Sequence, residues 1–199
     1  MYVKIPAILI ALTFHELSHG ITAKFLGDDT AEKNGRLTLN PLSHIDVIGA
    51  LMLFFGPFGW AKPVPVNPMN FKNPKKDMAI VAVAGPLANI LIAALTGFII
   101  KTDISGWLWN FAIYFFYINI GLAVFNLLPI YPLDGSRILV AFLNRRQVSI
   151  YLKSMRVVPL IFIIMMSVEW LLKFPILSYI LNPIFSPAYK MAIKLFIGS

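Results

Sequence analysis

Four stretches of the chain are apolar and have lengths close to or above that of a helix that crosses a membrane. They cover residues 1–26, 78–100, 107–125 and 157–172, and a helix needs about 20 residues to cross the hydrocarbon core of a bilayer. Segments rich in Pro, Gly and charged residues separate them. The pattern predicts an all-α polytopic membrane protein, a helical bundle of about four to six membrane segments.

Four other segments carry weaker patterns. Residues 47–60 are apolar but short and broken by Gly and Pro, which predicts a re-entrant or interfacial segment after the first helix. Residues 35–40 alternate polar and apolar side chains and predict a short β-strand. The Pro-rich residues 61–77 predict an extended loop. Residues 174–199 contain three prolines and fit either an interfacial helix or a fifth span.

The C-terminal half of the chain contains an interrupted span and a basic segment. The third span is interrupted at residues 126–135, and a short helix is predicted over 136–143. A basic loop is predicted to follow at about 145–156, before the fourth span. We therefore expect a single membrane-embedded domain, residues 1–199, with its core in about 1–145 and additional membrane or interfacial segments in 156–199.

Composition agrees with a membrane location. The 199 residues are 58% hydrophobic, the mean hydropathy is +0.77, and only 13% of residues are charged. A soluble domain has about a quarter of its residues charged. The net charge of +8 fits cytoplasmic loops rich in Lys and Arg better than a nucleic-acid partner. The chain has no Cys, so any zinc ion must be held by His and carboxylate side chains.

The basic residues predict an orientation. If residues 47–60 are re-entrant, the loops at 24–77 and 137–156 share one side of the membrane and carry most of the Lys and Arg. The positive-inside rule places that side in the cytoplasm and the N-terminus outside. The opposite side has Lys4, Lys101 and Lys173.

The first apolar stretch contains the pattern H-E-x-x-H. His15 and His19 are four residues apart, so on a helix they lie on the same face and can bind one metal ion. Glu16 is adjacent and can contact a water on that metal without being a ligand. Ionisable side chains at this depth are costly in lipid and indicate a functional site.

A catalytic zinc has three protein ligands and one open position. His15 and His19 lie roughly 16 and 10 Å from the cytoplasmic end of their helix, and Asp134 lies roughly 13 Å from the same face. This shared depth predicts Asp134 as the third ligand. His44, the third histidine of the chain, fits a structural role or a supporting role beside the ligands. Glu169, near the outer end of its span, fits an interfacial carboxylate.

Two motifs resemble those of the site-2 protease family of intramembrane zinc metalloproteases. They are His-Glu-Leu-Ser-His-Gly at 15–20 and Asn-Leu-Leu-Pro-Ile-Tyr-Pro-Leu-Asp-Gly at 126–135. Stretches within 40–46, 60–68 and 85–89 are also similar to that family. The chain has no room for the PDZ or CBS domain of many members and so resembles the compact branch. The resemblance implies one Zn²⁺ per chain, Asp134 as a zinc ligand and Asn89 as a donor to the oxyanion. An amide that packs helices together is an equally good interpretation of Asn89.

The resemblance implies peptide-bond hydrolysis in or near transmembrane segments of membrane-protein substrates, as in regulated intramembrane proteolysis. Glu16 would be the general base. We expect a multi-pass protein of a prokaryotic plasma membrane, with the lipid bilayer around it and its active site open to the cytoplasm. The predicted strand at 35–40 and the 47–60 segment could pair with an extended substrate. A divalent-metal transporter and a non-catalytic metal-binding membrane protein are the alternatives.

Overall fold

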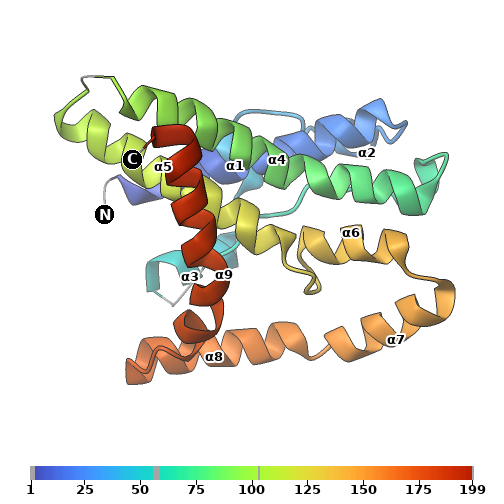
Figure 1. The fold of residues 1–199 in the computed structure, drawn as a ribbon. Coiled ribbons are helices and arrows are strands. Elements are labelled where there is room, and N and C mark those ends of the chain that lie inside the picture. The colour runs from blue at the N-terminus through green and yellow to red at the C-terminus, as the bar shows by residue number, and fades with distance from the viewer. Residues whose placement is uncertain (1–2, 56–58, 103, 199) are drawn as a thin grey trace.

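The computed structural model describes residues 3–55, 59–102 and 104–198, and this part of the chain is helical (Figure 1). No sheet forms within these ranges, and an isolated β-bridge pairs Ile45 with Ala61. The prediction of an all-α protein is therefore confirmed. The helices are α1 (Lys4–Phe25), α2 (Thr30–Lys33), α3 (Val47–Phe55), α4 (Pro74–Ile100), α5 (Gly106–Leu127), α6 (Asp134–Phe142), α7 (Arg145–Met155), α8 (Val158–Leu172) and α9 (Ile176–Ala192), with single turns η1 (Pro41–His44), η2 (Pro68–Asn70) and η3 (Ile193–Ile197).

Four helical stretches in the described part of the chain are long and apolar enough to cross a membrane. They are α1, α4, α5 and the stretch Arg145–Leu172, which α7 and α8 form together. The four predicted spans are thus present. Helix α4 starts at Pro74, four residues before the predicted start at 78, since proline is well suited to a first helical turn and the Asp77 carboxylate accepts a hydrogen bond from the Asn73 amide.

The basic loop predicted at about 145–156 is wrong, because most of it forms α7. The Asn144 side chain accepts a hydrogen bond from the Gln147 amide, and the Gln147 side chain accepts one from the Asn144 amide. This capping box starts a helix directly after α6. The charged side chains of α7 share the helix with the apolar Val148, Ile150, Leu152 and Met155, so a cluster of charges did not by itself indicate a loop.

Helices α1, α4 and α5 pack together and α6 packs on α4. The contacts are lined by small side chains, since Ala7, Ala11, Ala82 and Ala93 are all fully buried. Small residues allow membrane helices to approach closely. Helix α8 runs alongside this bundle (Figure 1), and none of its residues is buried within the described chain.

The segment between α1 and α4 doubles back along the bundle. It leaves from the end where α2 lies, places α3 beside the N-terminal half of α1, and returns to the start of α4 (Figure 1). A small pocket between α3 and α1 is lined by residues of both, including Gly49, Ala50, Ile8 and Leu12. The described parts of this path fit a re-entrant or interfacial segment, which stays a prediction for residues 47–60.

The β-strand predicted at residues 35–40 is wrong. Local hydrogen bonds hold this stretch instead: the Thr38 hydroxyl accepts from the Asn40 amide, and the Asn40 side chain accepts from the Leu42 amide. Such short side-chain-to-backbone bonds compete with strand pairing. The edge proposed for an extended substrate at 35–40 is therefore absent.

The C-terminal residues form α9, which continues through η3. This helix runs across the other long helices rather than alongside them (Figure 1). It packs on α5 and α4, with Tyr189 at Gly121 and Phe196 at Gly97. Of the two alternatives for 174–199, this arrangement favours the interfacial helix.

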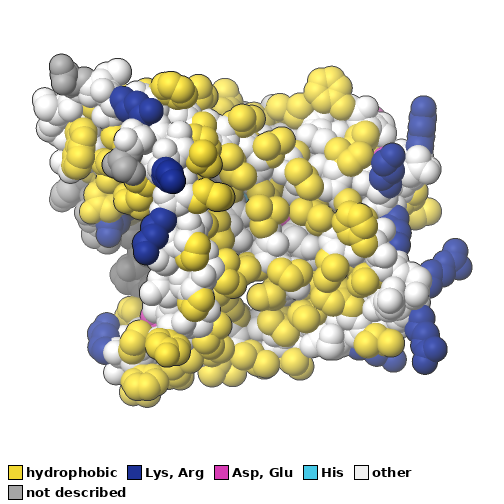
Figure 2. All heavy atoms as spheres, viewed as in Figure 1, with side chains coloured by type: hydrophobic (Ala, Val, Ile, Leu, Met, Phe, Trp, Pro, Cys, Tyr) yellow, Lys and Arg dark blue, Asp and Glu magenta, His cyan; other side chains and the backbone are white. Residues whose placement is uncertain are grey.

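The surface separates apolar and basic side chains. Figure 2 shows hydrophobic side chains across the middle of one face and Lys and Arg at its two ends, most densely at the end where α2 and the turn from α6 to α7 lie. That end corresponds to the side predicted to be cytoplasmic.

Candidate metal centre

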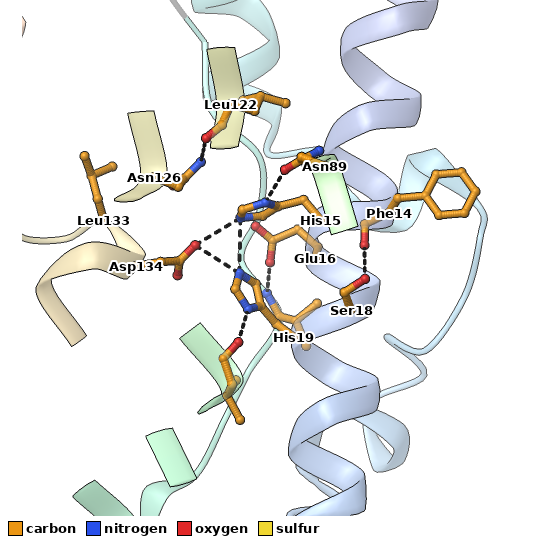
Figure 3. Close-up of polar contacts among 12 residues, drawn as sticks. Phe14, His15, Glu16, Ser18, His19, Asn89, Leu122, Asn126, Leu133 and Asp134 are labelled. Carbon is orange, nitrogen blue, oxygen red and sulfur yellow. Dashed lines mark hydrogen bonds and ion pairs between the residues drawn. The ribbon is translucent and has the colours of Figure 1, made fainter. Parts of the chain in front are cut away.

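The predicted ligands His15, His19 and Asp134 meet inside the bundle (Figure 3). The two histidines lie one turn apart on α1, and Asp134 is the first residue of α6. The Nε2 atoms of the histidines are 3.1 Å apart, and each is 3.2 Å from Oδ2 of Asp134. All three side chains are buried. A break in the helical backbone after α5 thus brings a carboxylate to the level of the histidines.

Hydrogen bonds on the far side of each imidazole fix its orientation. Nδ1 of His15 donates to Oδ1 of Asn89, and Nδ1 of His19 donates to the Val81 carbonyl oxygen, both at 2.7 Å. With the proton on Nδ1, each Nε2 is an acceptor and faces Asp134. Oδ2 of Asp134 has no hydrogen-bond donor in the described chain. Three buried acceptors therefore converge on one point, an arrangement that a cation stabilises.

The spacing of these acceptors fits zinc. Tetrahedral zinc with ligands at about 2.0–2.1 Å places neighbouring ligand atoms about 3.3 Å apart. The separations here are 3.1 and 3.2 Å. Two imidazoles and one carboxylate also leave the fourth position of a catalytic zinc free for water or substrate.

Glu16 lies beside the two imidazoles but outside the ligand group (Figure 3). Its side chain is half-buried, and Oε2 accepts a hydrogen bond of 2.8 Å from the Val64 amide. Val64 belongs to the segment that returns from α3 to α4. This contact steadies the carboxylate without consuming both of its oxygens, which suits a proton acceptor next to the metal position.

Gly85 of α4 faces the metal centre at very close range. A Cβ atom at this position would lie 2.6 Å from Cε1 of His15 and 2.6 Å from Cε1 of His19. Carbon atoms do not approach so closely without movement of one of them. The absence of a side chain therefore lets α4 pack directly against both imidazoles, close to Nε2 of His19.

We expect Gly85→Ala to displace both imidazoles and weaken zinc binding by at least about tenfold, the lower end of the effect of losing a ligand's supporting contact. Zinc competition with a chromophoric chelator measures this in detergent. Ala84→Val adds bulk to the same turn beside an external groove lined by Ala84, and zinc binding should not change. Equal affinity for Gly85→Ala and the unmodified protein would contradict this role for Gly85.

Asn89 belongs to a buried chain of carboxamides behind His15. Its Oδ1 accepts from His15, while its Nδ2 donates to Oδ1 of Asn119 at 2.8 Å and lies 3.3 Å from the Ala11 carbonyl oxygen. Asn119 in turn donates to the Phe115 carbonyl oxygen. Both asparagines are fully buried. These bonds use both the oxygen and the nitrogen of the Asn89 carboxamide. The geometry therefore favours a role of Asn89 in orienting His15 over its predicted role as a donor to the oxyanion.

Asn119 was not identified from the sequence as part of this site. The available signal was a polar Asn within an otherwise apolar span. His44 and Glu169, the other two candidates, lie outside the metal group. His44 is buried and its Nε2 donates to the Thr38 carbonyl oxygen at 2.9 Å. No hydrogen bond joins it to the ligands in the described ranges, and its bond to Thr38 lies within the loop before α3. The Glu169 carboxylate accepts from the amides of Leu177 and Ser178 at the start of α9.

A buried carboxylate that the sequence did not single out holds the segment carrying Val64. Asp28 follows α1 and is fully buried. It accepts hydrogen bonds from the amide and hydroxyl of Thr30, the amide of Asn67 and Nδ2 of Asn70. The bonds to Asn67 and Asn70 fasten the loop before α4 to the end of α1.

These bonds predict a dependence of stability on pH. Burial alone would raise the pKa of Asp28, but the hydrogen bonds from Thr30, Asn67 and Asn70 outweigh it and lower the pKa in the folded protein. The stabilisation is therefore present above the unfolded pKa of about 3.9 and is lost as pH falls through the folded pKa. We expect Asp28→Asn to cost about 1.5–3 kcal/mol at neutral pH and to flatten the acid side of the Tm profile in detergent.

The control is Asp29→Asn, which removes an exposed carboxylate paired with Lys33. Its effect on Tm should be small, since exposed ion pairs contribute about 0–1 kcal/mol. An Asp28→Asn profile that matches the control would show that the Asp28 bonds do not stabilise the fold.

Comparisons with known proteins agree with the site. Residues 98–168 match peptidase family M50, a region that includes Asp134 but not the two histidines. The candidate zinc metalloprotease YwhC of Bacillus subtilis (strain 168) is 39% identical over 142 residues, which cover 66% of this chain and 65% of YwhC. The candidate zinc metalloprotease Rip2 of Mycolicibacterium smegmatis is 29% identical over 147 residues, covering 68% of this chain and 55% of Rip2. Rip3 of Mycobacterium tuberculosis is 31% identical over 140 residues, covering 70% and 30%.

The matched part of the chain thus spans less than two thirds of each of these relatives. No solved structure matches the chain significantly. The matches to M50 and to these relatives confirm the family resemblance found in the two motifs.

Proposed function

From the relationship of the chain to peptidase family M50, the site-2 proteases, and from its metal centre, we propose that the protein is a zinc metalloprotease that hydrolyses peptide bonds within the membrane. One observation carries the proposal. The Nε2 atoms of His15 and His19 and Oδ2 of Asp134 converge as buried acceptors within 3.2 Å of one another, with Glu16 beside them.

The residues around the centre have different roles in the proposed hydrolysis. A zinc ion held by His15, His19 and Asp134 would supply Lewis-acid activation of water and of the scissile carbonyl. Glu16 accepts the proton of the attacking water and passes it to the leaving amine. The Val64 amide holds one oxygen of Glu16 in place, and the other oxygen remains for the proton.

The oxyanion of the tetrahedral intermediate needs a hydrogen-bond donor. Asn89 is engaged with His15 and Asn119, so we propose Asn126 for this role. Asn126 lies near the end of α5 beside the metal centre (Figure 3). Its Nδ2 donates one hydrogen to the Leu122 carbonyl oxygen, and the second hydrogen remains for an oxyanion.

The setting of the centre indicates the substrate class. His15 and His19 lie well inside α1, a helix long and apolar enough to span the membrane. A bond cut there belongs to a membrane-protein segment, and because the amides of a helix are hydrogen-bonded, that segment must locally unwind before attack. We propose regulated intramembrane proteolysis in a prokaryotic plasma membrane, with the basic end of the bundle and the access to the site on the cytoplasmic side.

Reconstitution in liposomes tests the proposal. The zinc-loaded chain should cleave a set of single-span substrates, and zinc trapped inside the liposomes should not leak out faster than from protein-free liposomes. Zinc flux without cleavage would favour a metal transporter. Zinc binding with neither flux nor cleavage would favour a non-catalytic metal-binding protein.

A further inference from the structure

A cavity of about 530 Å³ lies at the basic end of the bundle, apart from the metal centre. It is an open cavity, lined by residues from the start of α4, from α6 and from α7. Met78, Val140 and Val148 belong to its apolar wall, and Lys75, Arg137 and Arg145 belong to its lining. We call this cavity the basic slot.

The charge of the basic slot is one-sided. Its three cations come from three different helices, and no Asp or Glu is among the described residues that line it. The structure shows no ion pair to Lys75, Arg137 or Arg145 within the described ranges. The Lys75 ammonium donates to the Leu143 carbonyl oxygen, which ties α4 to the turn between α6 and α7. Asp77, the acid closest to Lys75 in sequence, is buried and accepts from the Asn73 amide.

The position of the slot corresponds to a membrane surface. Lys75 lies in the first turn of α4, and Arg145 begins the stretch that continues through α8, both candidate membrane spans. Lys and Arg in such positions contact lipid headgroups while their stems lie on apolar surface. An apolar wall together with three exposed cations matches a molecule with an apolar tail and an anionic head.

We propose that the basic slot binds an anionic phospholipid, with acyl chain along Met78, Val140 and Val148 and phosphate at Lys75, Arg137 and Arg145. The occupant is a lipid and not a soluble anion because most of the lining is apolar and the slot lies where spanning helices begin. The lipid would lie against α6, the helix that begins with Asp134. The proposal stands on the slot alone and does not require the protease assignment.

The test is a titration of the full chain in detergent with phosphatidylglycerol or phosphatidylcholine of identical acyl chains, followed by native mass spectrometry. Phosphatidylglycerol should bind more tightly. The triple variant Lys75→Gln, Arg137→Gln, Arg145→Gln should weaken it on the order of 100-fold, since each of the three cations near the headgroup contributes about 1 kcal/mol and about 1.4 kcal/mol is a tenfold change in affinity. Val148→Trp keeps the charge but narrows the slot and should also weaken binding.

The matched control removes the same charge from exposed positions outside the slot: Lys33→Gln, Arg146→Gln, Lys153→Gln. It should bind phosphatidylglycerol as the unmodified chain does. Equal loss in both triple variants would show general attraction to anions and overturn the proposal. Two results would assign the slot to a free phosphate group instead. One is that glycerol phosphate displaces bound phosphatidylglycerol at the same concentration at which added phosphatidylglycerol does so. The other is that Val148→Trp does not change the affinity for phosphatidylglycerol. Circular dichroism of each variant shows that the helical fold is intact.

Discussion

Glu16→Gln is expected to abolish peptide-bond cleavage while zinc remains bound. Glu16 is outside the ligand group, so its amide analogue leaves His15, His19 and Asp134 in place. The amide cannot accept the proton of the attacking water. General-base catalysis contributes about 10²–10⁴-fold to such a reaction, and cleavage should fall by at least that factor. Zinc content by elemental analysis and the rate of cleavage of a single-span substrate are the two measurements.

The chain offers a matched control in Glu32, one of its three glutamates. Glu32 is exposed in part and pairs with Lys24 at 2.5 Å. Glu32→Gln should cleave at the rate of the unmodified protein. Cleavage by Glu16→Gln at more than about a tenth of that rate would exclude Glu16 as the base.

Asp134→Asn is expected to lose both zinc and activity. Oδ2 of Asp134 closes the ligand triangle with the two Nε2 atoms, and it receives no hydrogen bond from the described residues that would give it another role. Because the loss of a partner behind a ligand already costs about 10–100-fold in metal affinity, the loss of a charged ligand should cost more than about 100-fold. Competition with a chelator measures the zinc affinity. Comparing the melting temperatures of the metal-free variant and the metal-free unmodified protein separates loss of the metal from misfolding.

Asp29→Asn serves as the control, because Asp29 pairs with Lys33 at the surface. It should bind zinc normally. If Asp134→Asn also bound zinc normally, the third ligand would have to come from elsewhere, and His44 and Glu169 would be the next residues to change.

Much of the candidate metal centre can be predicted from the sequence, because helix geometry and distance along the chain limit where its side chains can lie. A spacing of four residues places His15 and His19 on one face of any helix. The broken helix before Asp134 limits how far that carboxylate lies from the membrane surface. Hydropathy fixes the spans, since a bilayer demands long apolar helices. Depth and spacing together therefore selected three side chains that the structure brings together as a group able to hold one metal ion.

The supporting residues depend on tertiary packing and could not be predicted in the same way. The approach of α4 to α1 decides that Asn89 meets His15 and that Gly85 packs against both imidazoles. The sequence at 35–40 has a strand-like alternation, yet Thr38 and Asn40 satisfy nearby backbone groups with their own side chains. The direction of α9 across the bundle depends on where Tyr189 meets α5.

The position of the cut tests the central claim most directly. A single-span substrate is incubated with the zinc-loaded protein in liposomes, and the two fragments are identified by mass spectrometry. We expect new termini within or at the edge of the apolar span of the substrate, formed by the unmodified protein and not by Glu16→Gln. Absence of fragments, cuts confined to soluble parts of the substrate, or the same fragments from Glu16→Gln would contradict intramembrane metalloproteolysis at this site.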